Sequence, residues 1–143
     1  MMLIEIKETA FEPYQRLLEY QSQAEFAGKF GATAVFVGSM REFNQGDDVG
    51  AMLLEHYPGM TEKYLEKISD EAANKWDILD SLIVHRVGEM LPNDPIVLVA
   101  VWSAHRAAAF DASRYLMEEL KSRAPFWKKE ALAKGERWVE KNT

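Results

Sequence analysis

The residues best suited to chemistry lie in the ten-residue block Lys121–Glu130, which reads KSRAPFWKKE. Because Pro125 makes a rigid corner, Lys121 and Lys128 can be directed at a common point. A partly desolvated lysine beside other cations has a lowered pKa, which suits proton transfer or nucleophilic attack. Cations near a helix end also favour the helix dipole, and the two aromatic residues could belong to the core. A structural role for the block therefore stays open beside the catalytic one.

A second candidate site is the segment Ser103-Ala104-His105-Arg106, which lies between an apolar run and a predicted helix. The free N–H groups of a helix N-terminus, together with a histidine and an arginine, can bind an anion. The alternative is that Ser103 caps the helix and His105 is a surface residue. The residue types alone do not decide between these two interpretations.

A third candidate is the loop Arg41–Gly46, since arginine can bind phosphate through its planar guanidinium. An arginine in a polar loop is also often only solvated. His56 and His85 are predicted to be structural, because the three histidines of the chain lack the spacing of metal ligands. We predict no metal and no cofactor, since the sequence contains no phosphate-binding loop or dinucleotide-binding glycine motif.

The composition limits the chemistry further, because the chain has 143 residues and no cysteine. Disulfides, thiolate metal sites and a cysteine nucleophile are all excluded. Any sulfur chemistry needs sulfur that another molecule brings. The length suits one sizeable core, and no Gly/Ser-rich or Pro-rich tract divides the sequence, so we predict a single domain over residues 1–143.

The charge is distributed unevenly along the chain. The formal net charge is −6, which argues against a nucleic-acid partner. Residues 103–130 nevertheless carry six Lys or Arg against four Asp or Glu, a local charge of +2 that leaves −8 on the remainder. This pattern favours a local anion site on an acidic protein. The start, Met1 to Ile6, is too short and too polar for a signal-peptide core, and no uncharged stretch approaches a membrane span. We expect a cytoplasmic protein with no membrane partner.

The first half of the chain predicts two helices and two strands that could position these residues. A helix begins at Pro13, where apolar residues recur at helical spacing. Residues 32–40 and 51–57 are rich in β-branched and aromatic types, with a loop at 44–48, and are predicted to pair as a hairpin. An apolar stripe with charges opposite it predicts the second helix over 61–76.

The second half predicts two strands, over 81–87 and 95–102, and a third helix over 104–123. The second of these strands has no polar face, so it should be central in its sheet and covered on both sides. Pro125 ends the helix, because the residue before a proline avoids the helical region. The tail to Thr143 indicates a last strand near Trp138-Val139. Strands and helices that mix without strict alternation predict an α+β fold with antiparallel hairpins.

Four segments of the sequence, in order, resemble the large, catalytic subunits of molybdopterin synthases. Each short match alone carries little weight, but four in the family's order, ending in a ten-residue block, are specific, and the similarity spans nearly the whole chain. The segments are Leu54–Glu62 (LEHYPGMTE), His85–Glu89 (HRVGE), Ser103–Arg106 with Phe110, and Lys121–Glu130.

The resemblance implies an α/β hammerhead fold, with a mixed, largely antiparallel sheet packed against about three helices. It implies a homodimer within a heterotetramer, in which each large subunit binds a small ubiquitin-like sulfur carrier. That carrier ends in a Gly-Gly thiocarboxylate, the sulfur donor. The implied reaction adds two sulfurs to cyclic pyranopterin monophosphate (precursor Z), which gives molybdopterin for molybdenum cofactor biosynthesis.

The resemblance also implies roles for individual residues. Lys121 and Lys128 match the catalytic lysines. A tail ending in glycines needs a narrow channel with a cationic end, which we assign to Phe126 and Trp127 beside the lysines. Ser39 stands where other members of the family often have a basic residue. The residues implied in substrate binding are Ser39, Met40, Arg41, His105, Arg106, Lys129 and Glu130.

Two alternatives from other classes stay open. The chain could be a non-catalytic homologue that binds a phosphate or pterin, although such a protein would tolerate the loss of one lysine and here both are present. It could also be an assembly scaffold, although a scaffold does not require the cationic residues that match. An assay for the dithiolene product, with precursor and a thiocarboxylated partner, separates these alternatives from the enzyme.

Overall fold

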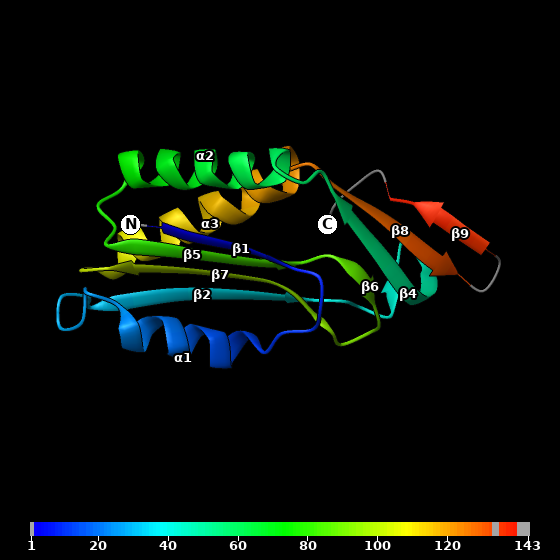
Figure 1. Cartoon of the computed structure of the whole chain (residues 1–143), viewed down its shortest axis with the longest axis horizontal. Coiled ribbons are helices and arrows are strands. Elements are labelled where there is room, and N and C mark those ends of the chain that lie inside the picture. The colour runs from blue at the N-terminus through cyan, green and yellow to red at the C-terminus, as the bar shows by residue number, and fades with distance from the viewer. Residues whose placement is uncertain (1, 133–134, 140–143) are drawn as a thin grey trace.

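The structure is a computed structural model that describes residues 2–132 and 135–139 (Figure 1). The predicted tail beyond Val139 and the first residue of the predicted domain lie outside the described residues. The helices within those ranges are α1 (Pro13–Gln23), α2 (Met60–Lys75) and α3 (Arg106–Arg123). The strands are β1 (Met2–Lys7), β2 (Ala32–Ser39), β3 (Phe43–Asn44), β4 (Asp47–His56), β5 (Asp80–Arg86), β6 (Gly88–Met90), β7 (Pro95–Ser103), β8 (Phe126–Leu132) and β9 (Gly135–Trp138).

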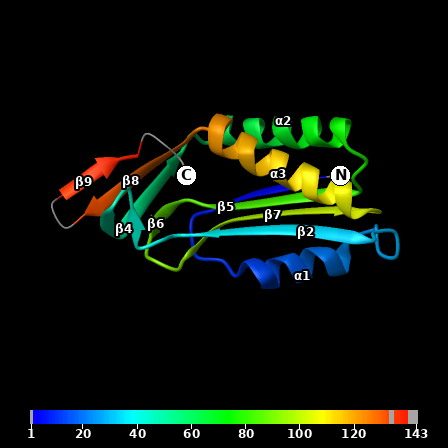
Figure 2. The same ribbon diagram turned by 180° about the vertical axis from the view of Figure 1, so that it is seen from behind.

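The first sheet has the strand order β1-β5-β7-β2, and it forms the centre of the molecule. Strand β1 is parallel to β5, whereas β5–β7 and β7–β2 are antiparallel. Helices α2 and α3 cover one face and α1 covers the other, as Figures 1 and 2 show from opposite sides. None of the helices in the described part of the chain is long and apolar enough to cross a membrane.

Strand β7 is central and buried along nearly its whole length, which confirms the prediction from its apolar run. Its side chains alternate between the two faces, as in any strand. Leu98, Ala100 and Trp102 pack with the α1 side, and Val99 and Val101 pack with the α2 and α3 side. A strand that is covered by helices on both faces needs apolar residues at both alternations.

The second sheet has the order β3-β4-β8-β9, with β6 also paired to β4, and it lies beyond one end of the first (Figure 1). All its pairs are antiparallel. Two mixed or antiparallel sheets with three helices confirm the predicted α+β fold. Both α2 and α3 lie within two residues of their predicted bounds, and the last strand is confirmed as β9.

The predicted hairpin between residues 32–40 and 51–57 is wrong, because the two strands belong to different sheets. Strand β2 pairs with β7, and β4 pairs with β8. A register shift at Gly38/Ser39 ends β2 and directs the chain out of the first sheet. The hairpin that does form joins β3 to β4 through Gln45 and Gly46, whose positive φ angles of 53° and 82° are those of a tight type I′ turn.

Four strands were not predicted: β1, β3, β6 and β8. Strand β1 lies at the edge of the first sheet and is only half-buried, so its sequence lacks a continuous apolar run. Strands β3 and β6 have two and three residues, too few for a periodic signal. Strand β8 begins within the cationic block, where the lysines concealed its alternation of buried and exposed residues.

A substitution at Gly31 tests the packing that joins β2 to the start of α3. The Gly31 N–H donates to the carbonyl of Ser103 over 3.0 Å, and a Cβ there would clash with the carbonyl oxygen of Ala104. We expect Gly31→Ala to lower the free energy of unfolding by about 1–3 kcal/mol, because two backbone segments must move apart. Gly50→Ala is the control, since its Cβ would meet no atom within 4 Å. Equal denaturation midpoints for the two variants would contradict this packing.

Candidate active site

A cavity of about 320 Å³ lies where the two sheets meet, and residues from both sheets and from the end of α3 line it. Its charged lining residues in the described part of the chain are Arg41, Lys121, Lys128 and Glu130. Most of the remaining lining is apolar. Three cations and one carboxylate in a half-enclosed, largely apolar cavity make a site for a small anion.

The two lysines approach this cavity from either side of the proline corner. Lys121 lies in the last turn of α3, and Lys128 lies in β8. The carbonyl of Pro125, between them, accepts a hydrogen bond of 3.0 Å from the Thr61 hydroxyl. The same hydroxyl oxygen accepts the N–H of Tyr57 over 3.0 Å, at the junction of β4 and α2. The corner is thus fixed to a second element, and both lysines line one cavity as the sequence predicts.

The environment of the pair lowers both lysine pKa values. Burial lowers the pKa of Lys121 to about 8, with further contributions from the charge of Lys128, a hydrogen bond with Lys128 and the charge of Arg41. Burial also lowers the pKa of Lys128, while its hydrogen bond with Lys121 and the charge of Glu130 oppose the change. This pattern is expected when Lys128 donates and Lys121 accepts. At pH 7, a pKa near 8 leaves about a tenth of Lys121 neutral, so Lys121 is the better proton acceptor.

The segment from Ser39 to Arg41 forms another wall of the cavity, immediately after the register shift that ends β2. The backbone of Met40 is held on both sides: its N–H donates to Asp94 and its carbonyl accepts from Asn93, each over 2.9 Å. The Met40 side chain is buried. Arg41 therefore extends from a fixed backbone, and its guanidinium lies 5.4 Å from the Phe43 ring centre.

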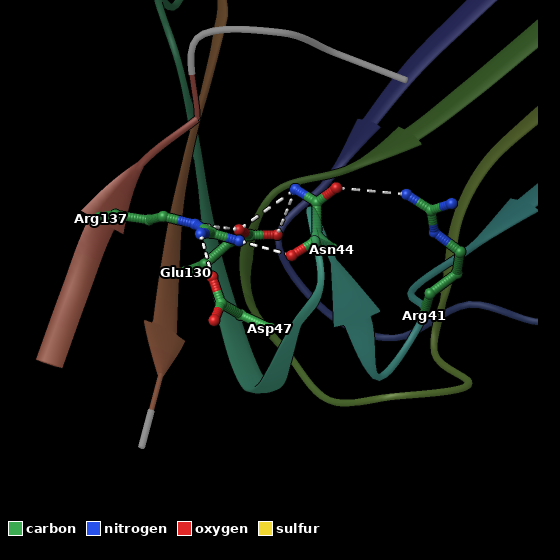
Figure 3. A network of polar contacts seen from close by, with 5 residues as sticks. All are labelled: Arg41, Asn44, Asp47, Glu130 and Arg137. Carbon is green, nitrogen blue, oxygen red and sulfur yellow. Dashed lines mark hydrogen bonds and ion pairs between the residues drawn. The ribbon is translucent and has the colours of Figure 1, made fainter. Parts of the chain in front are cut away.

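Glu130, another residue that lines the cavity, is buried and belongs to a polar network (Figure 3). The side-chain amide of Asn44 donates to both carboxylate oxygens, over 3.2 and 3.1 Å. Arg137 donates to one of them over 2.9 Å. Arg41 reaches the network by donating to the side-chain oxygen of Asn44, Oδ1, over 3.5 Å. The network joins the β3–β4 hairpin to β8 and β9, so it fixes the shape of the cavity.

Strand alternation separates two of the predicted site residues from the cavity. Phe126, Lys128 and Glu130 lie on one face of β8, and Trp127 and Lys129 lie on the other. Lys129 forms an ion pair of 3.4 Å with Glu136 and lies 5.6 Å from the ring centre of Trp138. Trp127 is 47% exposed. Phe126 therefore shares the strand face of Lys128 but does not line the cavity, and Trp127 lies on the opposite face.

His85 is a buried neighbour of the two lysines. The sequence predicts that it is a structural residue. Its ring stacks on Phe126, with centres 4.0 Å apart and planes inclined by 16°. Nδ1 lies 2.9 Å from the carbonyl oxygen of Arg86, which can accept its proton. Burial lowers the pKa of His85 to about 3, despite the hydrogen bond with Arg86. A neutral ring supports Phe126 without adding charge near the lysines.

His105 and Arg106 lie at the opposite end of α3 from Lys121. Lys121 is fifteen positions after Arg106 in the helix, which is about 22 Å at 1.5 Å per residue. Arg106 instead lines a smaller cavity, of about 250 Å³, with Thr33 and Phe110 between α3 and β2. Within one chain, these two residues do not join the lysines.

Three residues that shape the site were given no role from the sequence: Thr61, Asp47 and Arg137. Asn44 was named only as part of the candidate loop Arg41–Gly46. Asn44 and Asp47 flank the Gln45-Gly46 turn, and a turn recognised there would have placed both at one end of a hairpin. Nothing in the sequence pairs Arg137 with Glu130. In the described residues, no group of three or more His, Asp or Glu has the arrangement of a metal site.

The fold and the cavity together define an α+β protein with a paired-lysine pocket at the junction of two sheets. Residues 7–123 match the family model described as "MoaE protein". A molybdopterin synthase catalytic subunit from Pseudomonas aeruginosa is 52% identical over 139 residues, which cover 97% of this chain and 91% of that protein. The chain belongs to the MoaE protein family.

Solved structures agree with this assignment. The crystal structure of molybdopterin synthase from Staphylococcus aureus has a TM-score of 0.83 and 35% identity, and the match covers 94% of this chain and 95% of that one. A chain in a complex of subunits 1 and 2 of molybdopterin-converting factor from Helicobacter pylori has a TM-score of 0.80. That match covers 98% of this chain and 92% of that one, and at 22% identity it shows likeness of fold.

Proposed function

We propose that this protein is the catalytic subunit of a molybdopterin synthase and transfers two sulfurs to cyclic pyranopterin monophosphate. The family assignment supports the enzyme class. One structural observation carries the residue roles: Lys121 and Lys128 line one largely apolar cavity from either side of Pro125, and burial lowers the pKa of both. A neutral amine beside a charged one can accept and donate protons while the charged one stabilises negative charge.

The absence of cysteine is consistent with a sulfur donor on another protein. We propose that the donor is the C-terminal Gly-Gly thiocarboxylate of a small ubiquitin-like subunit, and that it is replaced between the two sulfur additions. The Helicobacter pylori neighbour was solved as a complex of two subunits, which supports a small-subunit partner. The lysine cavity supplies the cationic end that a carboxylate or thiocarboxylate requires.

We propose that His105 and Arg106 act in the site of a second copy of the chain. One α3 helix separates them from the lysines of their own chain by about 22 Å, yet the family resemblance assigns them to the substrate site. In a homodimer, His105 and Arg106 of one chain can lie beside the lysines of the other, which accounts for both the separation and the resemblance. The edge strand β2 and helix α3 expose apolar side chains, as such an interface requires. Phe110, beside Arg106 in the smaller cavity, is 66% exposed, and Val35 and Phe36 of β2 are 40% and 43% exposed.

Incubation of the protein with the pterin precursor and a thiocarboxylated small subunit tests the function. We expect formation of the dithiolene, detected by mass spectrometry, and none with a partner that ends in an ordinary carboxylate. Tight precursor binding without product would instead identify a non-catalytic binding protein.

Replacing Arg106 tests the second-copy site. We expect Arg106→Ala to weaken precursor binding about tenfold, the lower range for a charged hydrogen bond, with binding of the small subunit unchanged. Calorimetric titration measures both. The effect should decrease as salt rises, because partly exposed charges are screened. Arg114→Ala is the control, since this arginine lies on the same helix with its side chain 83% exposed. Unchanged precursor affinity in Arg106→Ala would contradict a phosphate role.

A further inference from the structure

Arg137 makes three contacts that tie the last described strand to the active-site cavity (Figure 3). Its Nε donates to Glu130 Oε1 over 2.9 Å, and one terminal nitrogen, Nη1, lies 2.7 Å from Asp47 Oδ2. The other terminal nitrogen donates to the backbone carbonyl of Asn44 over 2.8 Å. Each of the three guanidinium nitrogens therefore binds a group on β8 or on the β3–β4 hairpin. Hydrogen bonding to Glu130 is the main reason that the pKa of Arg137 is raised.

Glu130 occupies a special position among the charges around the lysine pair. Arg41 approaches the pair from the end of β2, the buried His85 from β5, and Glu130 from β8. Glu130 is the one acidic residue that lines the cavity in the described part of the chain, and it is 6% exposed. A buried carboxylate must be compensated by hydrogen bonds or by an opposite charge. Asn44 and Arg137 provide both.

We propose that Arg137 is a positioning residue for the catalytic lysines, which holds the Glu130 carboxylate in place and so sets the charge that Glu130 presents to Lys128. This inference rests on the proposed function only for the role of the lysines in sulfur transfer. The geometry itself, a buried carboxylate held between a cavity lysine and an arginine of β9, does not depend on the reaction.

The expected consequence follows from the sign of each charge. Glu130 favours the charged form of Lys128 and raises its pKa. With Arg137 removed, the carboxylate loses its cationic partner and is free to turn toward the lysine. The pKa of Lys128 therefore rises. With Glu130 replaced by glutamine the favourable charge is lost, so the lysine pKa falls.

The test is a measurement of the lysine pKa values in Arg137→Gln and Glu130→Gln, by competitive labelling with trace acetic anhydride between pH 6 and 11 and peptide mass spectrometry. We expect the pKa of Lys128 to rise by about 0.5 in Arg137→Gln, less than the 1–3 that a charge in direct contact produces. It should fall by a similar amount in Glu130→Gln. In the double variant it should match Glu130→Gln, because Arg137 acts through Glu130.

Two further variants serve as controls for the measured lysine pKa values. Arg114→Gln removes an exposed arginine from α3 and should leave the lysine pKa values unchanged. Arg137→Lys, which keeps the charge but not the three-point contact, should give a smaller rise and serves if Arg137→Gln does not fold. An unchanged pKa in Arg137→Gln, or an equal rise with and without Glu130, would overturn the proposal. The labelling needs neither substrate nor partner, so the lysine pKa values can be measured even in a protein that is inactive in sulfur transfer.

Discussion

Replacing either Lys121 or Lys128 by alanine is expected to reduce sulfur transfer about 10²-fold, the lower range for loss of a positioned acid or base. The two amines share one cavity and a hydrogen bond, so neither can replace the other. Without Lys128, Lys121 loses the neighbouring charge that helps to lower its pKa, and without Lys121, Lys128 loses its hydrogen-bond partner. The rate of dithiolene formation, measured with saturating precursor and thiocarboxylated partner, gives the effect directly.

The fold should survive both substitutions, because each removes a partly buried charge and leaves the helix end and Pro125 in place. Thermal unfolding of the variants checks this. Lys63→Ala, at an exposed position on α2, is a control for the loss of a lysine as such. Turnover close to that of the unmodified protein in both active-site variants would remove the pair from the mechanism.

The helices and the buried strand β7 were predictable because each depends on a local signal. Pro13 and Pro125 mark a helix start and a helix end, and the apolar run of β7 reflects its cover on both faces. The α+β class followed from the order of these elements. Such signals survive in a single sequence because they concern residues within one or two turns of each other.

Strand pairing was less predictable, because it depends on the path of the chain between strands. Sequential strands usually pair, which favoured a hairpin between 32–40 and 51–57. The register shift at Gly38/Ser39 and the tight turn at Gln45-Gly46 send β2 and β4 to different sheets instead. A change of direction within a few residues leaves no periodic pattern to read.

The candidate site shows the same division between local and long-range information. The proline corner predicted that Lys121 and Lys128 share a cavity, and they do. Lys129 points away from the cavity that Lys128 lines, because successive side chains of a strand alternate between its faces. The sequence did not predict β8 as a strand, so it gave no sign of this difference. The network around Glu130 joins residues 86 and 93 positions apart, which no spacing argument on one sequence could connect.

The last prediction concerns the partner's tail, which must bring the sulfur to a chain that has no cysteine. Glycines at the end of a tail pass through a narrow opening because they lack side chains, and a cationic end then receives the thiocarboxylate. We expect that deleting the partner's last two residues abolishes sulfur transfer and leaves most of the binding affinity, since the contact between the folded surfaces remains. Calorimetry and the dithiolene assay measure the two effects separately.

The same geometry predicts a side product when no precursor is present. If the tail enters beside Phe126, its terminal carbonyl carbon comes within reach of the Lys121 amine, which is partly neutral because burial lowers its pKa to about 8. The amine can then attack that carbon and form an amide, while the sulfur leaves as hydrosulfide. Mass spectrometry of the incubated complex should find the Gly-Gly tail joined to Lys121, and none in Lys121→Ala. A complex structure with the tail on the outer face of β8, beside Trp127 and Lys129, would contradict this path and the assignment of Lys121 with it.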